Sequence, residues 1–356
     1  MSEVRAKKAL GQHFLVDLNI ARKICDALSG GVRPEAGAET RAVAAGSADA
    51  DAETRTRVAG YAGAGAEART MAAGSADAGA EARTKATGTA DADAETRRGV
   101  AASADARLAA DTTAAGAPAA AEEERSGAVP CDVLEVGCGM GVLTQFLLRR
   151  GDITTYGAEI DPESVEYLHA HFPEFAPRLI EGDFLRMDLR ERFPEGLRII
   201  GNFPYNISSQ IFFKVLENRD LVPECVGMIQ KEVAVRIAEP PGSKEYGILS
   251  VLLQAWYDIE YLFTVNETVF NPPPKVKSAV IRLRRNSVGR LGCDEALFVK
   301  VVKASFGQRR KMIRNSLRAV FGDFGGAEHP FFTQRAEQLS VADFVQLTDW
   351  VAANRK

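Results

Sequence analysis

Apolar residues recur along the chain with two different periods. Short apolar runs that predict buried strands occur at Asp132–Val136, Ile153–Glu159, Leu179–Ile180, Leu197–Ile200 and Val226–Gln230. Helical periods predict helices at Ile20–Leu28, Val142–Arg150, Pro162–His171, Ser208 or Ser209 to about Asn218, from Lys231 onward, and 247–257. Because strands and helices alternate, the pattern predicts an α/β fold with a doubly wound, mostly parallel sheet.

The period changes twice more toward the C-terminus. Ile259–Val265 and Val276–Leu283 alternate like strands and follow one another with no helix between them, which predicts an antiparallel strand at the end of the sheet. After Arg285 the strand pattern stops, and residues 294–355 contain helical periods alone. We therefore predict a small C-terminal helical domain at 286–356, and a main domain made of residues 1–31 and 129–285.

Residues 32–128 interrupt this pattern with a repetitive segment. Blocks of 14 residues start at Gly46, Gly60, Gly74 and Gly88, and they hold mostly small and charged residues. Without large apolar side chains such a segment cannot bury enough surface to offset the entropy lost on ordering. We interpret it as a low-complexity insertion, mostly disordered, that carries no chemistry.

Composition narrows the class of protein. No run of about 18 uncharged apolar residues exists and the N-terminus lacks a secretion signal, so we expect a cytoplasmic protein that does not span a membrane. The five cysteines form no C-x-x-C pair, which argues against a zinc site, and we expect no metal. Residues 271–318 hold 13 Lys or Arg and two acids, a local positive charge typical of nucleic-acid binding.

Candidate site residues follow four successive strands. Gly137, Gly139 and Gly141 open the helix after the first strand, where glycines allow a ligand to approach the backbone. Glu159 ends the second strand and is spaced to accept hydrogen bonds from both hydroxyls of a ribose. Asp183 and Asn202 follow the third and fourth. Since the crevice of such a sheet lies beyond the carboxyl ends of its strands, we expect one shared cleft.

The stretch Asn202-Phe-Pro-Tyr205 indicates the chemistry. It resembles the motif of amino-methyltransferases, in which an amine with a delocalised lone pair must be held by hydrogen-bond acceptors. The Asn202 side-chain oxygen and a backbone carbonyl next to Pro204 can supply these acceptors, because proline fixes the local backbone. Tyr205 offers a ring face on which a base can stack. Transfer would then depend mostly on positioning.

These motifs together resemble the small-subunit ribosomal RNA adenine dimethyltransferase family. The resemblance covers nearly all of the chain outside residues 32–128. The matching stretches are Leu10–Leu15, Glu135–Gly141, Glu159–Asp161, Gly182-Asp183, Gly201–Ser208, Gln230–Glu232, Phe270–Ser278 and Phe306–Leu317. Two departures are His13, where some relatives carry Asn, and Phe203, where Leu is usual.

The resemblance implies a Rossmann-like class I methyltransferase sheet and S-adenosyl-L-methionine as cofactor. It implies dimethylation at N6 of two adjacent adenosines, in a hairpin loop near the 3′ end of small-subunit RNA within an immature 30S particle. By matching position, Phe270 would stack on the target base opposite Tyr205, and Asp183 would hold the adenine amine of the cofactor. The implied cofactor-binding residues are His13, Leu15, Gly137, Gly139, Glu159, Asp183, Phe184 and Asn202. We expect a monomer.

The basic segment supplies the predicted RNA contacts. Gln308–Phe321 is predicted to be a helix whose residues Ile313, Leu317, Val320 and Phe321 face the core. Lys311, Arg314 and Arg318 would form one stripe beside that apolar face and contact phosphates. The full set of predicted RNA-binding residues is Lys275, Lys277, Arg309, Arg310, Lys311, Arg314 and Arg318.

Three other functions stay open at this point. An antibiotic-resistance enzyme that methylates a large-subunit adenine shares the cleft but typically lacks the stretch at Phe306–Leu317. A non-catalytic ribosome assembly factor would not need the intact Asn202–Tyr205 motif. A nicotinamide dehydrogenase would need a proton donor that the sequence does not reveal.

Overall fold

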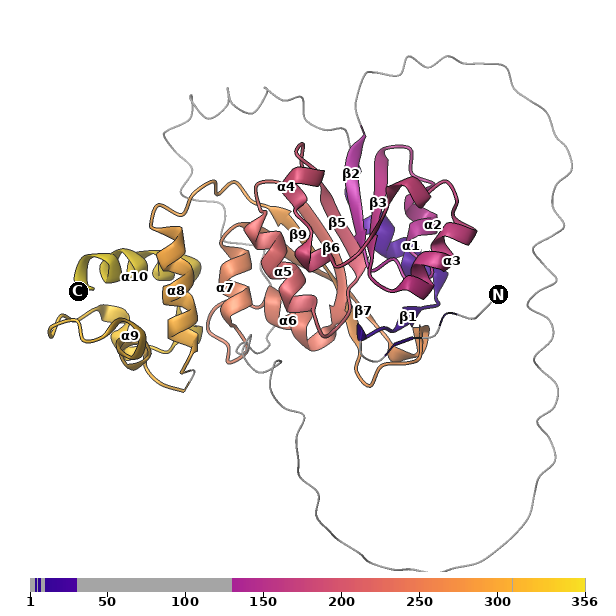
Figure 1. Cartoon of the computed structure of the whole chain (residues 1–356). Coiled ribbons are helices and arrows are strands. Elements are labelled where there is room, and N and C mark those ends of the chain that lie inside the picture. Colours follow the sequence, from indigo (N-terminus) through magenta and orange to yellow (C-terminus); the bar gives the residue numbers. More distant parts are fainter. Residues whose placement is uncertain (1–3, 5, 8–9, 31–129, 309, 356) are drawn as a thin grey trace, which may run out of the picture. The chain divides into compact units, whose positions relative to one another are not determined.

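The computed structural model describes residues 4, 6–7, 10–30, 130–308 and 310–355, and the predicted insertion at 32–128 lies outside them. The centre is a seven-stranded sheet in the order β4-β3-β2-β5-β6-β9-β7 (Figure 1). Its first five strands are parallel, and β9 runs antiparallel to both β6 and β7. The predicted sheet with an antiparallel end is confirmed. The strands are β2 (Cys131–Val136), β3 (Ile153–Glu159), β4 (Leu179–Glu181), β5 (Arg198–Asn202), β6 (Glu224–Gln230), β7 (Tyr257–Val265) and β9 (Ser278–Arg285).

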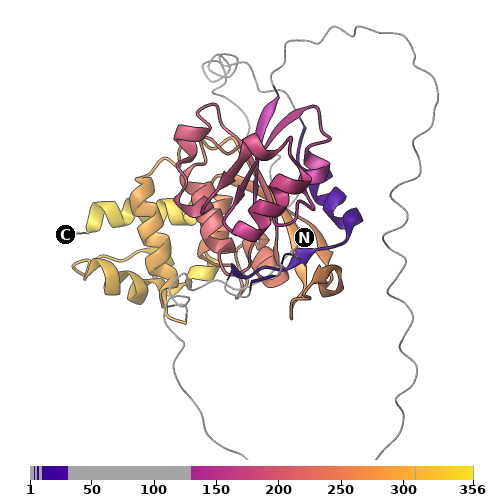
Figure 2. The ribbon, with the colours of Figure 1, turned by 45° about the vertical axis from the view of Figure 1, so that its right-hand side comes forward.

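Successive side chains of each strand enter different layers of the core. Ile199 packs in one buried cluster with α5 (Ser208–Glu217), α6 (Lys231–Ala238) and α7 (Ile248–Gln254). Its neighbour Ile200 packs in a second cluster with α1 (Leu18–Ala27) and α2 (Thr144–Leu147). In Figure 2 the indigo helix α1 and the salmon helices α5 to α7 lie on opposite sides of the sheet. Both faces are therefore covered, as the near-continuous apolar strands predict.

Two predicted helices differ in detail from the observed ones. The helix expected at 142–150 shrinks to α2, because Gly139 and Gly141 hold positive φ angles and keep the preceding backbone in a turn. Neither Ser208 nor Ser209 caps α5: the N-cap is Ile207, and Ser208 Oγ instead donates to the carbonyl of Tyr205 at 3.2 Å. The helix α3 (Pro162–His171) has the predicted bounds.

The C-terminal segment is helical, with α8 (Glu295–Phe306), α9 (Ile313–Phe321) and α10 (Val341–Asn354). Its apolar side chains belong to the same core cluster as α5 to α7. Trp256 is 1% exposed and packs edge-on against Phe298 in the core, as expected. Trp350 is partly buried and packs on Phe324 and Phe332 at the margin of the same cluster. Within the described part of the chain, no helix combines the length and apolarity needed to cross a membrane.

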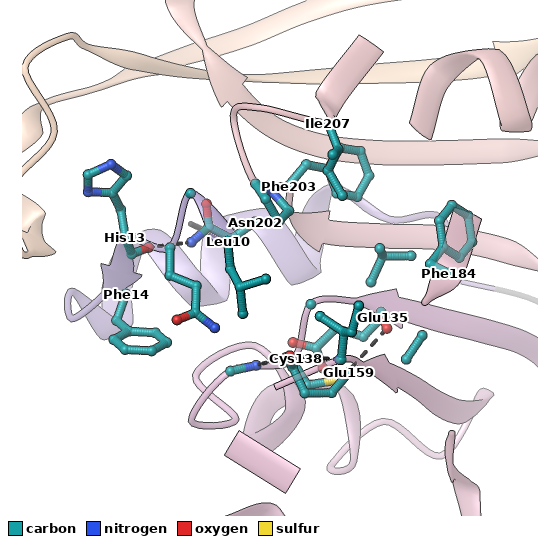
Figure 3. Close-up of a pocket in the computed structure, with 18 of the residues that line it drawn as sticks. Leu10, His13, Phe14, Glu135, Cys138, Glu159, Phe184, Asn202, Phe203 and Ile207 are labelled. Atoms are coloured by element: carbon teal, nitrogen blue, oxygen red, sulfur yellow. Dashed lines mark hydrogen bonds between the residues drawn. The ribbon is translucent and has the colours of Figure 1, made fainter. Parts of the chain in front are cut away.

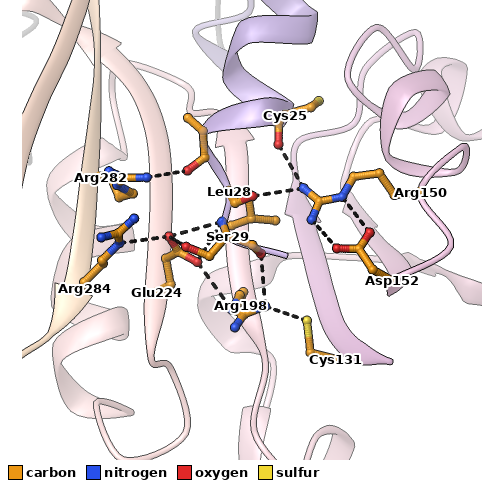
Figure 4. Close-up of polar contacts among 11 residues, drawn as sticks. Cys25, Leu28, Ser29, Cys131, Arg150, Asp152, Arg198, Glu224, Arg282 and Arg284 are labelled. Atoms are coloured by element: carbon orange, nitrogen blue, oxygen red, sulfur yellow. Dashed lines mark hydrogen bonds and ion pairs between the residues drawn. The ribbon is translucent and has the colours of Figure 1, made fainter. Parts of the chain in front are cut away.

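Arginines hold the end of α1 at the edge where the strands begin (Figure 4). The last carbonyls of a helix have no partner inside the helix. Here the carbonyls of Cys25 and Leu28 accept hydrogen bonds from Arg150 at 3.1 and 3.0 Å, and that of Ala27 accepts one from Arg282 at 3.0 Å. The end of α1 is thereby fixed to the sheet.

Arg198 contacts the residues that flank the long insertion on both sides, Ser29 and Cys131. Its Nη1 lies 3.1 Å from the carbonyl of Ser29 and 2.7 Å from Sγ of Cys131. The buried carboxylate of Glu224 accepts hydrogen bonds from the backbone N–H and the hydroxyl of Ser29, and it pairs with Arg198 at 3.3 Å. Ser29 and Cys131 therefore meet at the amino-terminal edge of β2, β5 and β6, the edge opposite their carboxyl ends.

We predict that a short Gly/Ser linker can replace residues 32–128 without loss of the fold. The contacts at Ser29 and Cys131 keep the two sides together, and closing a shorter loop costs less entropy. The amounts of helix and strand measured by circular dichroism should match those of the described elements, and thermal unfolding should stay cooperative. As a control, Arg198→Met should lower the melting temperature of both forms, because it leaves the buried Glu224 with fewer partners. A shortened chain that fails to fold would contradict the prediction.

Candidate active site

A pocket of about 210 Å³ opens at the carboxyl ends of β2, β3, β4 and β5. Gly137, Glu159, Asp183 and Asn202 all line it, so the predicted shared cleft is confirmed. The N-terminal segment 10–15 forms another wall. Figure 3 shows His13 and Phe14 on one side of this pocket, with Glu135, Cys138 and Glu159 below.

The glycine turn after β2 is shaped for a ligand. Gly137 and Gly139 have φ angles of +76° and +53°, which side-chain-bearing residues rarely adopt. A Cβ on Gly137 would meet only Pro204 Cδ at 3.8 Å, and one on Gly182, after β4, would meet nothing within 4 Å. Open space therefore faces the backbone at both places.

Glu159 holds this turn in place. Its Oε2 accepts the N–H of Gly139 at 2.8 Å, and its Oε1 accepts the N–H groups of Ile160 and Asp161, both at 2.9 Å. A carboxylate offers about four acceptor positions, so roughly one is left for a ligand hydroxyl. Holding both ribose hydroxyls, as the sequence predicts, would require this 4% exposed carboxylate to release a backbone partner.

Asp183 and Phe184 form the wall after β4. Oδ1 of Asp183 accepts the N–H of Leu185 at 2.9 Å, which leaves Oδ2 to accept from a ligand, with Arg186 at 3.5 Å. Lys214, on α5, supports this wall from behind, and no sequence motif indicates that role. Its ammonium donates to the carbonyls of Leu185 and Met187 at 3.0 and 2.6 Å and lies 5.5 Å from the centre of the Phe184 ring.

Asn202 is oriented by the N-terminal segment. Its Nδ2 donates to the carbonyl of His13 at 2.9 Å (Figure 3). Because the amide nitrogen faces a carbonyl, the oxygen Oδ1 is left as the acceptor. His13 in turn places its Nδ1 2.9 Å from the carbonyl of Pro272. His13, which is predicted to contact the cofactor, therefore also fixes the orientation of Asn202, which is predicted to hold the amine.

Two glycines explain how a phenylalanine ring fits at position 203. The ring is 1% exposed, and a Cβ on Gly201 or Gly227 would come within 2.8 or 2.4 Å of it. These glycines on β5 and β6 make room for a ring where leucine is usual. The carbonyl of Pro204 accepts the N–H of Ile207 at 3.2 Å, which leaves the carbonyl of Phe203, next to Pro204, as the backbone acceptor at this turn.

Tyr205 is half-buried and lines the pocket. Its hydroxyl lies 2.5 Å from Oγ of Ser278, and its ring centre lies 5.3 Å from that of His13, with the planes inclined by 30°. Burial raises the pKa of the phenol above its usual value, although the bond to Ser278 opposes that shift. The ring is therefore neutral at physiological pH.

Phe270 does not line the pocket, and its stacking on the target base opposite Tyr205 stays a prediction. Phe270 begins β8 (Phe270–Asn271), which pairs with β1 (Phe14–Leu15), and its side chain is 3% exposed within the α1 layer of the core. The ladder pairs Phe270 with Leu15, and turns the ring inward. The sequence could not show this because strands of two residues have no recognisable period.

Glu135 is a second residue of the pocket to which no sequence motif assigns a role. It is 1% exposed at the end of β2, lines the pocket, and accepts a hydrogen bond from Thr144 Oγ at 2.6 Å. Burial raises its pKa to about 8, against the opposing effect of the Thr144 bond. Glu135 is thus a neutral acid at pH 7. Cys138, in the glycine turn, is buried, and burial raises its pKa too, which fits a packing role.

The predicted RNA-binding residues fall into two groups. Lys275, Lys277, Arg310 and Lys311 are exposed, whereas Arg309 lies outside the described residues. Arg314 forms an ion pair with Glu328, and Arg318 forms one with Asp323 at 3.1 Å. These half-exposed pairs would have to exchange partners to reach a phosphate, a modest cost since such pairs contribute little.

The predicted stripe on one helix is wrong. The helix begins at Ile313, not Gln308, so Lys311 precedes it and shares no face with Arg314 and Arg318. Ile313 and Leu317 are buried as predicted, but Val320 is 60% exposed. The backbone N–H of Ile313 bonds to the carbonyl of Gln334, and this contact with a distant segment sets the start of the helix.

These features fit S-adenosyl-L-methionine. The glycine backbone faces open space, Glu159 retains acceptor capacity for a ribose hydroxyl, and Asp183 has an oxygen for an adenine amine. No group of three or more His, Cys, Asp or Glu side chains among the described residues could hold a metal ion. The fold and the site therefore define a methyltransferase that depends on S-adenosyl-L-methionine.

Comparison with known proteins narrows this class. Residues 130–353 match the family model for ribosomal RNA adenine dimethylase, and the chain belongs to that family. It is 61% identical over 218 residues to ribosomal RNA small subunit methyltransferase A of Parabacteroides distasonis, covering 61% of this chain and 81% of the relative. The Cytophaga hutchinsonii protein of the same name is 56% identical over 221 residues, covering 62% and 86%.

A solved structure supports the fold. The crystal structure of a dimethyladenosine transferase from Plasmodium falciparum superposes with a TM-score of 0.53 at 24% identity, covering 63% of this chain and 90% of that one. At this identity the similarity concerns the arrangement of the elements alone. It agrees with the parallel sheet that places the pocket at the carboxyl ends of the strands.

The first prediction for this site concerns Glu135 and pH. The carboxyl ionises near pH 4.5 in the unfolded chain but near 8 in the folded one, so the folded state binds more protons between these values. The free energy of unfolding should therefore fall as pH rises from 4.5 to 8, by up to about 1.4 kcal/mol per pH unit from this group. Glu135→Gln should flatten that slope in thermal unfolding at pH 5 to 8. The exposed Glu166→Gln should not, and an equal slope in both variants would refute the assignment.

The second prediction concerns Lys214. Lys214→Met removes the cation that holds the carbonyls of Leu185 and Met187, so the Asp183–Phe184 wall should loosen. Affinity for S-adenosyl-L-methionine, measured by calorimetry, should fall about tenfold, in line with the worth of hydrogen bonds from a charged group. Lys303→Met is the matched control, because Lys303 also lies over a ring, that of Phe213, which does not line this pocket. Equal affinity loss in both variants would contradict the role.

Proposed function

We propose that this protein transfers methyl groups from S-adenosyl-L-methionine to N6 of two adjacent adenosines in a hairpin loop near the 3′ end of small-subunit ribosomal RNA. The observation that carries the proposal is the orientation of Asn202, whose amide nitrogen is held by His13 and whose oxygen is left to accept. Relatives at about 60% identity are named for the small subunit, which favours it over the large-subunit alternative.

The residues of this chain would act by positioning. Bound S-adenosyl-L-methionine supplies an electrophilic methyl group. Oδ1 of Asn202 and the carbonyl of Phe203 accept the two amine hydrogens of the target adenine, which favours a pyramidal nitrogen whose lone pair faces the donor. The ring of Tyr205 supports the face of the base. No strong base is needed, because the amine proton becomes acidic once the methyl is bonded. Held this way, the reacting atoms meet with little further entropy to lose.

The substrate is best described as RNA within an immature 30S particle. Lys275 and Lys277 are exposed on the loop between β8 and β9, next to the strand start that contacts Tyr205. Arg310 and Lys311 are exposed before α9. Such cations would bind phosphates on both sides of an extruded base and make affinity fall steeply with salt. We further propose that the enzyme acts as a monomer in the cytoplasm.

Substitutions in the acceptor site should separate chemistry from binding. Asn202→Ala removes the amide acceptor and Tyr205→Ala removes the ring, so each should reduce methyl transfer below about 1% of the wild-type rate. Binding to immature small subunits depends on the basic residues and should survive. Labelled cofactor measures transfer, filter binding measures affinity, and mass spectrometry of RNA fragments locates the modified bases.

The matched control is Asn19→Ala, which changes an exposed asparagine on α1 that does not line the pocket. It should retain most activity. Undiminished transfer by Asn202→Ala or Tyr205→Ala would overturn the assigned roles. Modification mapped to a large-subunit fragment would overturn the proposed substrate.

A further inference from the structure

Ser278 is a buried hydroxyl that bonds to the ring placed under the target base. It opens β9, is 0% exposed, and lies with Oγ 2.5 Å from the hydroxyl of Tyr205. The two residues are 73 positions apart in sequence. A buried hydroxyl needs a hydrogen-bond partner, and the phenol of Tyr205 is that partner here.

This bond fixes the plane of the Tyr205 ring. A tyrosine side chain turns about two bonds, and both of its ends are held. At one end the backbone carbonyl of Tyr205 accepts from Ser208 Oγ at 3.2 Å, and at the other the phenol meets Ser278. The ring between these two points lines the pocket, with the His13 ring inclined to it by 30°.

The tether is anchored in the sheet and not in a loop. Ser278 pairs with Gln230 on β6 and with Val265 on β7, so its backbone lies between two neighbouring strands. Just before it, the carbonyl of Lys277 accepts the N–H of Lys231 at 2.9 Å. The position of Oγ is therefore set by a backbone paired on both sides, and the exposed Lys275 and Lys277 lie immediately before it in the sequence.

We propose that Ser278 is a positioning residue for methyl transfer, which acts through the Tyr205 hydroxyl to hold the ring in the plane on which the target adenine stacks. This rests on the proposed function. A base stacked on a fixed ring presents its amine at a fixed height between Oδ1 of Asn202 and the carbonyl of Phe203. Of the two rings predicted to contact the target base, Tyr205 lines the pocket and Phe270 is buried beside β1.

A double-mutant cycle tests this route. The variants are Ser278→Ala, Tyr205→Phe, which keeps the ring but loses the hydroxyl, and the two combined. Each single substitution should slow single-turnover methyl transfer about tenfold through small misalignment. The combined variant should be no slower than either single one, because both remove the same bond. Calorimetric affinity for S-adenosyl-L-methionine should stay near wild type in all three, and rates are compared well below the melting temperature of each variant.

A second readout follows the ring directly. With 2-aminopurine in place of the target adenine of a hairpin RNA, stacking on Tyr205 should quench fluorescence in the wild type, and Ser278→Ala should weaken that quenching without changing RNA affinity. Ser278→Cys, a weaker hydrogen-bonding group of similar size, should fall between the two.

Two results would contradict the proposal. One is a Ser278→Ala variant that transfers at the wild-type rate, and the other is an equal further loss when Ser278→Ala is added to Tyr205→Phe. Failure of the proposed function has a different signature, since the wild type would then neither methylate immature small subunits nor quench the probe.

Discussion

The hydrogen bond from Nδ2 of Asn202 to the carbonyl of His13 is the interaction on which the site depends. A side-chain amide donates through its nitrogen and accepts through its oxygen. Because Nδ2 of Asn202 donates to the carbonyl of His13, Oδ1 is the atom left to accept a hydrogen bond in the pocket. The bond also ties the N-terminal segment to the end of β5. That segment pairs with β8 through β1 and contacts Pro272, so the N-terminal wall of the pocket, Asn202 and the proline loop are held as one unit.

Buried carboxylates set a different constraint on the same pocket. Glu159 spends most of its acceptor capacity on backbone N–H groups, which keeps the glycine turn open, and Glu135 stays neutral because burial raises its pKa to about 8. Two ionised carboxylates this close in a buried site would repel one another. A neutral Glu135 beside Glu159 therefore lowers the electrostatic cost of placing a carboxylate at the glycine turn.

The carboxyl and amino ends of the parallel strands have different roles. The carboxyl ends of the strands carry the pocket, whereas the amino ends carry the arginine and glutamate contacts that hold Ser29 and Cys131. Since the insertion leaves and re-enters the described structure at the edge opposite the pocket, the fold can accept a long segment there without moving a site residue. Surface contacts of this kind tolerate long connections, because loop entropy grows slowly with length.

The sequence by itself determined which residues lie at the carboxyl ends of the parallel strands and which functional groups they bring there. Gly137, Glu159, Asp183 and Asn202 share a pocket because parallel strands must end at the same edge, and the bounds of β3 and α3 follow from their periods alone. What tertiary contacts decide could not be predicted in this way. Phe270 is turned inward by a two-residue ladder, α9 starts late because Ile313 bonds to Gln334, and Ser278 and Lys214 reach the site from distant elements. Periodicity reports which face of an element is apolar, but only the packed chain decides which distant polar group meets it.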